Sequence, residues 1–499
     1  MTGALLPLAV AVPLLAAAVL TVLREPALPR RAILLGTSAL SLGFGVLLVV
    51  ASWDGGIVSH NVGLWPNGIS IPFVGDMFGA LMIVVTSLLT LVCSAFAIAA
   101  GDEERRFFAP LVLVLAAGVN GALLTADLFN LFVFIEVMLL PSYGLLAMLT
   151  GIRGVRAGRL YVAMNLLTST VFLAGVGLVY GVTGTVNLGE LAGLAAESEL
   201  VATAVAVVLI ALSVKAAVVP VHGWLARTYP YASPAVTALF SGLHTKVAIY
   251  AIYRVYAVVF EGDSTYLWIG VVAMGVTMVV GVLGAVGENT TRSILAFHMI
   301  SQIGYILLGV ALFGPLGLTA GIFYLLHHMV VKASLFLSTG AVEVTYGTNR
   351  LDRLGGVART EPLLAAAFLG AALSLAGMPP FSGFVAKLTL VRAAFDEGQV
   401  AVAVVAVAVS LLTLMSMLKI WGGVFWGRSP EDVAGHHLER HPRGALLTRV
   451  RPALVLPALV LTGVTLGVGI GAQGLLVLAE QAAAGLLDTS GYIEAVIGR

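Results

Sequence analysis

Residues 200–226 read LVATAVAVVLIALSVKAAVVPVHGWLA. Such an apolar run of about 20 residues is long enough to cross the ~30 Å hydrocarbon core of a bilayer as a helix. Lys215 and Pro220 lie within the run. Because a proline removes a backbone donor and frees the carbonyl four residues earlier, a break at Pro220 is tolerated in a membrane mainly where protein or a water-filled cavity satisfies the backbone. The stretch therefore predicts a broken membrane helix that carries a buried charge.

Apolar runs of this kind recur along nearly the whole chain. Of the 499 residues, 60% are hydrophobic and only 10% are charged, and the mean hydropathy of +1.04 is outside the range of water-soluble domains. We therefore expect an all-α polytopic membrane protein. Its fourteen predicted helices cover residues 3–23, 31–52, 73–100, 107–125, 127–150, 159–181, 200–226, 233–260, 264–287, 294–313, 316–345, 360–395, 400–427 and 451–479.

The loops give an independent indication of topology. Alternate loops hold most of the arginines, whereas the intervening loops hold no Lys or Arg, and several of these carry acids. Because positive charge stays on the cytoplasmic side, both termini are predicted to face outside a bacterial cell (inner) membrane. Residues 53–72, rich in Gly, Pro and Asn, are expected to form a turn-rich extramembrane hairpin.

The prolines suggest an internal repeat. Pro220 interrupts the seventh predicted helix, and Pro379 and Pro380 interrupt the twelfth. Two broken helices five positions apart suggest inverted five-helix repeats, helices 4–8 and helices 9–13. The expected division of the chain is 1–106 for helices 1–3, 107–260 for the first repeat, 264–427 for the second, and 428–499 for helix 14 and a tail.

Several classes of function are disfavoured by what the sequence contains. Cys93 is the only cysteine, so disulfide frameworks and cysteine metal sites are excluded. The sequence has no basic run for nucleic acid and no phosphate-binding loop before a helix. We expect neither a cofactor nor a metal, so the energy for any transport must come from an ion gradient or a partner.

The most informative feature is the position of the lysines. All five lie within predicted spans, and every loop cation is an arginine. A charge at the centre of a membrane helix costs about 2.5–3.5 kcal/mol even on the lenient insertion scale. Unlike arginine, a lysine can release its proton near neutral pH when burial disfavours its charged form. These lysines, which predict a proton relay, are Lys215, Lys246, Lys332, Lys387 and Lys419.

One acid matches these cations. Glu136 lies near the middle of the fifth predicted helix, one turn before Pro141 and between apolar residues. It needs a cationic partner, and Lys215, at similar depth, is the natural candidate. A static buried ion pair that fixes helix packing is the alternative interpretation, but it does not account for the further buried lysines.

Histidines accompany the lysines. His328 and Lys332 are spaced i, i+4 and share a helix face, where a histidine is suited to proton exchange near neutrality. His244 and Lys246 point to nearly opposite faces, so we expect only one of them, the lysine, to meet the polar interior, and His244 to be a packing or water contact. Lys387 follows the break at Pro379 and Pro380, as a counterpart of Lys215 near Pro220. The secondary candidates are His222, His244, His298, His327 and Lys419.

Some of these groups have simpler interpretations. Lys419 is close enough to the end of its helix for its amine to reach the interface. Arg254 and Arg392 lie toward outer helix ends and are expected to be anchors. His222 and His298 could each hold ordered water or be packing groups, and Asp127 is expected to cap the fifth helix.

Five stretches resemble a known family. They are LFNLFVFIEVMLLPSYGL (128–145), LSVKAAVVPVHGWL (212–225), SPAVTALFSGLHTKVAIYAIYR (233–254), ILAFHMISQIGYILLG (294–309) and MPPFSGFVAKLTL (378–390). They look like the proton-translocating antiporter-like subunits shared by Mrp cation/proton antiporters and respiratory complex I. The resemblance implies fourteen helices, two inverted repeats with broken seventh and twelfth helices, and a hydrated central axis.

Within the family, the chain is most similar to the D type of Mrp subunit. The resemblance maps the family's acid onto Glu136 and its lysines onto Lys215, Lys246 and Lys332. Lys387 occupies the position that varies within the family, where a lysine fits the Mrp D type. The ending SGYIEAVIGR (490–499) also resembles that type, whereas His244 stands where an apolar residue is expected.

The expected function is therefore proton translocation within a hetero-oligomeric Na⁺(cation)/H⁺ antiporter, as a secondary transporter subunit and not as an enzyme. The expected partners are the other subunits of the complex, protons, Na⁺ and lipid. The alternative is a proton-pumping membrane subunit of a complex I-like NADH:quinone oxidoreductase or membrane hydrogenase. A structural scaffold and a self-contained carrier are the remaining possibilities.

Overall fold

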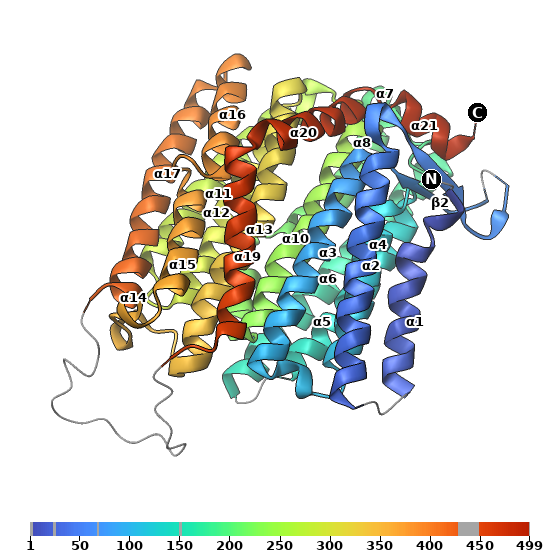
Figure 1. Ribbon diagram of the computed structural model, residues 1–499. Helices are drawn as coiled ribbons and strands as arrows, with labels where there is room; N and C mark the ends of the chain where they lie inside the picture. Colours follow the sequence, from blue (N-terminus) through green and yellow to red (C-terminus); the bar gives the residue numbers. More distant parts are fainter. Residues whose placement is uncertain (1–2, 23–25, 67–68, 149–151, 428–448, 499) are drawn as a thin grey trace.

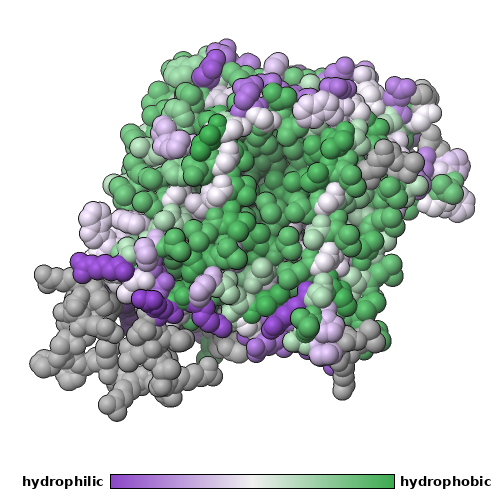
Figure 2. Space-filling model, viewed as in Figure 1, coloured by the Kyte–Doolittle hydropathy of each residue, from purple (hydrophilic) through white to green (hydrophobic). Residues whose placement is uncertain are grey.

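The computed structural model describes residues 3–22, 26–66, 69–148, 152–427 and 449–498. Long helices run side by side through the molecule, and both termini lie near the same end of the bundle (Figure 1). In Figure 2 a broad apolar belt separates two polar ends, as expected for a protein that spans a bilayer. We call the end that holds both termini the terminal end, and the opposite end, where Arg30 and Arg31 lie, the arginine-rich end.

Among the described residues, twelve helices are long and apolar enough to cross a membrane. They are α1 (Leu8–Val22, preceded by η1, Gly3–Leu5), α2 (Ala27–Ala51), α3 (Met77–Ala100), α5 (Leu128–Ala147), α6 (Ile152–Thr183), α8 (Glu199–Ala216), α10 (Pro234–Val259), α11 (Leu267–Gly287, preceded by η6, Ser264–Tyr266), α12 (Thr291–Ala311), α13 (Pro315–Tyr346), α17 (Val400–Ile420, followed by the π-helical turn η8, Trp421–Phe425) and α19 (Pro452–Ile470).

Two further spans are built from shorter helices. They are α4 (Phe108–Leu124) and the pair α15 (Pro362–Ala376) and α16 (Ser382–Asp396). Every one of the fourteen predicted spans thus has a helix at its place, and the predicted all-α polytopic fold is confirmed. The remaining short elements are η2 (Trp53–Gly55), η3 (Val62–Leu64), η4 (Asp102–Glu104), α7 (Leu194–Glu197), α9 (Gly223–Thr228), η5 (Tyr229–Tyr231), η7 (Leu351–Arg353) and α14 (Val357–Thr360).

Both proline-containing spans are broken in the same way. α8 ends at Ala216 and α15 ends at Ala376, and the capping residue that follows each, Ala217 or Gly377, has a left-handed backbone. In each break the next amide, that of Val218 or Met378, donates at 3.0 Å to the carbonyl five residues earlier. Cis peptide bonds follow at Pro220 and Pro380. The predicted breaks in the seventh and twelfth spans are therefore present.

A second pair of matching features lies where helices begin. The start of α5 pairs with the chain after α6, and the start of α12 pairs with the chain after α13, each through one short antiparallel bridge. Each of the four residues bonded in the first bridge has its equivalent in the second bridge 163 residues later in the chain. The bonds are Leu128 N to Val186 O (2.9 Å) and Leu188 N to Ala126 O (2.9 Å) in the first case, and Thr291 N to Asn349 O (2.9 Å) and Leu351 N to Asn289 O (3.1 Å) in the second.

The terminal end carries a small sheet and a helix cap. β1 (Val58–Asn61) pairs antiparallel with β2 (Pro72–Gly75), so a hairpin is present here, but its second strand begins where the predicted range 53–72 ends. The Asp127 carboxylate accepts the Asn130 amide at 2.7 Å, so the predicted cap of α5 is also confirmed.

The end of the fourteenth predicted helix, at 479, is wrong. The helix ends at Ile470, and after Gly471 the chain turns into α20 (Ala472–Leu487) and α21 (Ser490–Ile497). α20 lies across the terminal end of the bundle (Figure 1). Its buried residues, Ala479, Ala482, Ala483 and Leu486, follow the i, i+3, i+4, i+7 spacing of an amphipathic helix, which packs on a surface instead of crossing a membrane.

Close packing of α11 on α12 yields a test of the fold. A Cβ on Gly281 would lie 2.2 Å from the Ser301 backbone nitrogen, so one helix would have to move. We expect Gly281→Ala to lower stability by about 1–3 kcal/mol, the usual cost of overpacking, measured as the melting temperature of the purified complex. Gly275 lies in the same helix as Gly281, and a Cβ added to it would meet Val402 of α17 at an ordinary 3.7 Å. Gly275→Ala is therefore the matched control and should have little effect. Equal melting temperatures for the two variants would contradict this packing.

Candidate functional site: buried lysines and histidines

The predicted cations lie inside the helix bundle. Lys246 and Lys332 are fully buried, and Lys215 and Lys387 are 3% and 7% exposed. They come from different elements: the last turn of α8, the middle of α10, the middle of α13, and α16 just after the break. Helices distant in sequence thus bring four charged amines into one apolar interior.

Glu136 and Lys215 stand at one edge of this interior. Lys215 interacts electrostatically with Glu136, although the two form no ion pair within 4 Å among the described residues. Instead, the Ser169 hydroxyl donates to the Glu136 carboxylate, and the Lys215 amine has no hydrogen-bond partner in the described chain. The two charges are thus close enough to attract each other without being locked together.

Glu136 is only half-buried, whereas its counterpart Lys215 is buried. The surface of α5 and α6 around it carries the exposed apolar side chains Phe129, Leu140 and Leu167. A carboxylate that faces hydrocarbon is costly. We therefore expect this face of α5 and α6 to contact protein and not lipid.

His244 connects the first edge to the interior. Its Nδ1 lies 3.0 Å from the Tyr161 hydroxyl, which in turn lies 3.1 Å from the Ser142 hydroxyl. The imidazole packs on Phe240 with ring centroids 4.3 Å apart and interacts electrostatically with Lys215. His244 thus packs on an aromatic ring, as expected, and its Nδ1 also meets the Tyr161 hydroxyl, so Lys246 is not the only group of this pair with a polar neighbour. The helix α10 is buried all round.

Lys246, His328 and Lys332 form the centre. The Lys246 amine donates to Thr245 Oγ1 at 3.0 Å, and the Lys332 amine donates to the Leu295 carbonyl at 2.6 Å and lies 5.2 Å from the centre of the Phe336 ring. His328 interacts electrostatically with both lysines, and the lysines with each other. The i, i+4 pair predicted on one face of α13 therefore lies within electrostatic range of Lys246 on α10, while the Lys332 amine itself bonds to α12.

Lys387 stands at the far edge of the cluster. Its amine donates to Ser410 Oγ at 2.7 Å and to the Ala376 carbonyl at 3.1 Å, and it lies 5.0 Å from the centre of the Tyr305 ring. Ala376 is the last residue of α15, where the helix dipole is negative and favours a cation. Lys215 lies in the last turn of the other broken helix, α8, but its amine has no hydrogen-bond partner in the described chain.

The other histidines lie between these groups. His298 Nε2 contacts the Ser416 hydroxyl and interacts electrostatically with both Lys332 and Lys387. His327 Nδ1 lies 2.7 Å from the Ser382 hydroxyl and also interacts with Lys387. The groups thus form two electrostatically linked sets, one of Glu136, Lys215 and His244 and one that runs from Lys246 to Lys387. His244 and Lys246, two residues apart on α10, belong to different sets.

Several polar atoms in this interior lack a protein partner among the described residues. Such atoms in a buried site are usually satisfied by ordered water. They are Lys215 Nζ, His222 Nδ1, His244 Nε2, His298 Nδ1, Gln302 Nε2, His327 Nε2 and both ring nitrogens of His328.

Two secondary candidates lie away from the centre. His222 is half-buried just before α9, next to the break. The Lys419 amine donates to the Val286 and Glu288 carbonyls at 2.9 and 2.6 Å. Since those carbonyls lie at the end of α11, the geometry of Lys419 is that of a helix cap.

The prediction that Arg254 is an interfacial anchor is wrong. Its side chain is buried, forms an ion pair with Asp76 at 2.5 Å, and lies 4.5 Å from the centre of the Tyr492 ring. Tyr492 belongs to α21, which the sequence did not predict, so the groups that cover Arg254 could not be foreseen. Arg392 is exposed, in agreement with an anchor.

The hydroxyl partners of the charged groups were not predicted. Tyr161, Ser169 and Ser410 each contact a candidate residue, and the Tyr324 hydroxyl donates to Gln302 Oε1. The only signal for them in the sequence is a polar side chain within an apolar span, which membrane helices often satisfy through their own backbone. No group of three or more potential metal ligands occurs in the part of the chain described.

Comparison with known proteins identifies the family. Residues 125–413 match the family described as NADH:quinone oxidoreductase/Mrp antiporter, transmembrane. The chain belongs to this family. The matched segment contains all six primary candidates, from Glu136 to Lys387, whereas Lys419 lies beyond it.

Relatives within the NADH:quinone oxidoreductase/Mrp antiporter family are similar over most of their length. The chain is 39% identical to the D-type subunit of the Na⁺/H⁺ antiporter of Alkalihalophilus pseudofirmus, over 91% of each chain. It is 33% identical to the D-type subunit of the Na⁺/H⁺ antiporter of Bacillus subtilis, over 98% of each. A chain in the structure of the Mrp complex from Dietzia sp. DQ12-45-1b is 58% identical over the full length of both, with a TM-score of 0.94. The resemblance to the D type of Mrp subunit is thereby confirmed, and the chain is a multi-pass membrane protein.

Proposed function

We propose that the chain is the D-type, proton-translocating subunit of a multisubunit Na⁺(cation)/H⁺ antiporter. The observation that carries this proposal is the set of buried charged and titratable groups that lies between the two broken spans, from Lys215 to Lys387. Similarity to D-type antiporter subunits over nearly the whole chain supports it. It works as a transporter component within a hetero-oligomeric complex and performs no chemical conversion.

The relay consists of the chain's own amines and imidazoles. A proton passes between Lys246, His328 and Lys332, and then by His298 to Lys387, because each of these groups is within electrostatic range of the next. Ordered water completes the steps where ring nitrogens lack a protein partner. Neighbouring charges oppose one another, so a proton arriving on one amine favours release from the next.

Glu136 and Lys215 act as the switch. When the pair closes, the carboxylate holds the Lys215 amine in its charged form. When it opens toward Ser169, the buried ammonium loses that stabilisation and releases its proton toward His244. Glu136 and Lys215 form no ion pair within 4 Å in this structure, and Glu136 is half-buried on a surface that is costly to leave against lipid, which supports control of the switch by a neighbouring subunit.

The architecture that we propose for this relay is a pair of inverted repeats, helices 4–8 within residues 107–260 and helices 9–13 within residues 264–427. The matching breaks and the matching bridges 163 residues apart support it. The arginine-rich end faces the cytoplasm and both termini face outside a bacterial cell membrane, as supported by the distribution of loop charge.

The alternative is a proton-pumping subunit of a complex I-like oxidoreductase, which the family description also covers. The partners that copurify distinguish the two, since redox subunits support the alternative and small hydrophobic antiporter subunits support our proposal. Loss of Na⁺ tolerance in a deletion strain also supports the antiporter.

The relay is tested with Glu136→Gln, Lys215→Ala and Lys387→Ala in the assembled complex. We expect each to reduce cation-driven proton uptake into vesicles by about 100-fold, within the range of general acid–base contributions. Arg392→Gln, which changes an exposed cation of α16, is the control and should transport normally. Near-normal uptake by all three variants would contradict the relay.

A further inference from the structure

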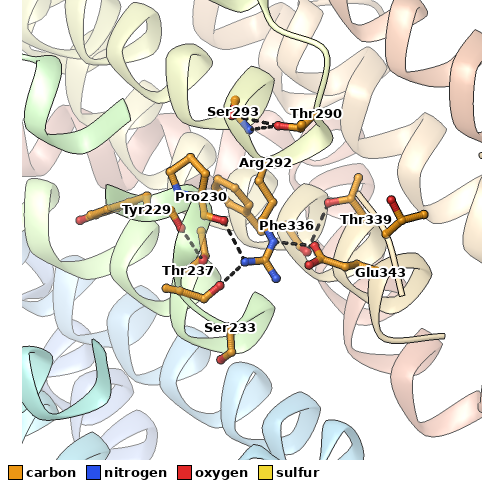
Figure 3. Close-up of polar contacts among 12 residues, drawn as sticks. Tyr229, Pro230, Ser233, Thr237, Thr290, Arg292, Ser293, Phe336, Thr339 and Glu343 are labelled. Atoms are coloured by element: carbon orange, nitrogen blue, oxygen red, sulfur yellow. Dashed lines mark hydrogen bonds and ion pairs between the residues drawn. The ribbon is translucent and has the colours of Figure 1, made fainter. Parts of the chain in front are cut away.

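The arginine-rich end holds a buried cation that the relay does not use. Arg292 lies in the first turn of α12 and is 7% exposed. Its Nε donates to the Glu343 carboxylate at 2.6 Å, and its Nη1 donates to the Pro230 carbonyl at 3.1 Å and to the Ala232 carbonyl. In Figure 3 the guanidinium lies between the chain at Pro230 and the end of α13 that carries Glu343.

These contacts join two separate parts of the fold. Pro230 and Ala232 belong to the turn between α9 and α10, directly after the broken seventh span. Glu343 lies in the last turn of α13, the helix that carries His328 and Lys332. The bridge between the start of α12 and the chain after α13 already ties those two helices together. Arg292 therefore fixes the turn that leads into α10 against one combined unit of α12 and α13.

The turn itself needs support. The α9 helix has six residues, and η5 has three, so little backbone bonding stabilises them. Thr237 Oγ1 donates to the Tyr229 carbonyl at 3.1 Å, which holds the turn to the start of α10. The Arg292 guanidinium adds the contact with α13, and its planar arrangement of donors suits several acceptors at once.

The repeat shows that the fold does not require an arginine here. The equivalent position, 163 residues earlier, is Phe129, at the start of α5, which is 47% exposed. The first half of the chain forms the equivalent backbone bridge, between Asp127 and Asn187, with an apolar residue at this position. A buried cation therefore occurs at only one of these two equivalent positions, at the junction of the helices that bear Lys246 and Lys332, whereas the buried ionisable group at the first bridge is the Asp127 carboxylate.

We propose that Arg292 is a positioning residue for proton transfer, which with Glu343 holds α10 and α13 in the register that brings Lys246 close to His328 and Lys332. This inference rests on the proposed relay. It gives Arg292 no part in carrying the proton, and it makes the α9–α10 turn the element through which the broken seventh span and α13 are mechanically linked.

The test compares Arg292→Gln, Arg292→Lys and Glu343→Gln in the purified complex reconstituted into vesicles. Amide hydrogen exchange over residues 229–237 and Na⁺-driven proton uptake per assembled complex are both measured. We expect Arg292→Gln to speed exchange in this turn and to reduce uptake by at least tenfold. Arg292→Lys keeps the charge but loses the planar donors, so it should recover part of both. Glu343→Gln removes the charge that pairs with Arg292 but keeps the two carbonyl contacts. If Arg292→Gln does not assemble, the exchange rate and the uptake of Glu343→Gln test the Arg292–Glu343 contact instead.

Arg350→Gln is the matched control. Arg350 pairs with Asp352 at the same end of the molecule, but both side chains are more than half exposed. We expect it to leave exchange and uptake unchanged. If Arg292→Gln speeds exchange over residues 229–237 but keeps uptake within twofold of wild type, Arg292 has a structural role only. If exchange is unchanged, Arg292 does not hold the turn. Lys332→Ala in the same vesicles tests the relay separately from the role of Arg292. Normal uptake by Lys332→Ala would contradict the relay, whereas the exchange measurement would still show whether Arg292 holds the turn.

Discussion

Lys332→Met is expected to abolish transport without destabilising the protein. General acid–base groups contribute about 10²–10⁴-fold, so we expect cation-driven proton uptake to fall by about 100-fold or more. Methionine fills nearly the same volume, and it removes a buried charge that costs about 2.5–3.5 kcal/mol. The lost bond to the Leu295 carbonyl is worth only about 1–3 kcal/mol. The melting temperature of the complex should therefore stay the same or rise.

Lys419→Met provides the matched comparison. The Lys419 amine caps α11 through the Val286 and Glu288 carbonyls. These bonds are only part-buried, so each is worth about 0.5–1.5 kcal/mol, and losing both should lower stability by about 1–3 kcal/mol, with uptake per assembled complex within about twofold of wild type. Measurement of melting temperature and uptake on both variants separates a relay lysine from a structural one. If Lys332→Met lowers the melting temperature and retains uptake, the assignments of the two residues are reversed.

Arg254→Gln is expected to have the largest effect on stability. The substitution leaves the Asp76 carboxylate buried without its ion-pair partner, and breaking a buried pair in this way costs about 3–5 kcal/mol. Asp76 also caps α3 by accepting the Gly79 amide at 2.9 Å, so it cannot easily move away. We expect a large drop in melting temperature and in the yield of assembled complex.

Controls distinguish the ion pair from its surroundings. Asp76→Asn together with Arg254→Met removes both charges and should be less destabilising than Arg254→Gln alone. Tyr492→Phe keeps the ring that lies over the guanidinium and should be nearly neutral. Arg392→Gln, an exposed arginine toward the same end, should also be neutral. If Arg254→Gln is as stable as Arg392→Gln, the buried pair contributes nothing measurable.

The broken spans show which features of this fold can be predicted from the sequence. Pro220 and Pro380 predict the breaks because the loss of a backbone donor is a local property of the chain. The expected match between Lys387 and Lys215 is less direct. Lys387 follows its break, and only a long side chain that returns to the Ala376 carbonyl brings its amine to the end of α15. That path depends on the packing of α16 against α17, which no local pattern contains.

The contacts of His244 and Arg254 show more clearly what the sequence does not predict. Both lie on α10, which is buried on every side, so no apolar face distinguishes one direction from another. The partners of these residues come from α6, from the start of α3 and from α21, far away in the sequence. Helical periodicity predicts a buried face only when the opposite face meets a different environment, and in α10 it does not.

By itself the sequence determined that this chain spans a membrane many times, where its helices lie, and that four lysines are buried at a high energetic cost. These properties follow from the transfer of each segment out of water, which depends on local composition. Only the tertiary structure decided which groups face one another: Glu136 with Ser169, Lys246 with His328, and Arg292 with Glu343. Those contacts depend on how distant helices pack, and packing is set by the shapes of all side chains together.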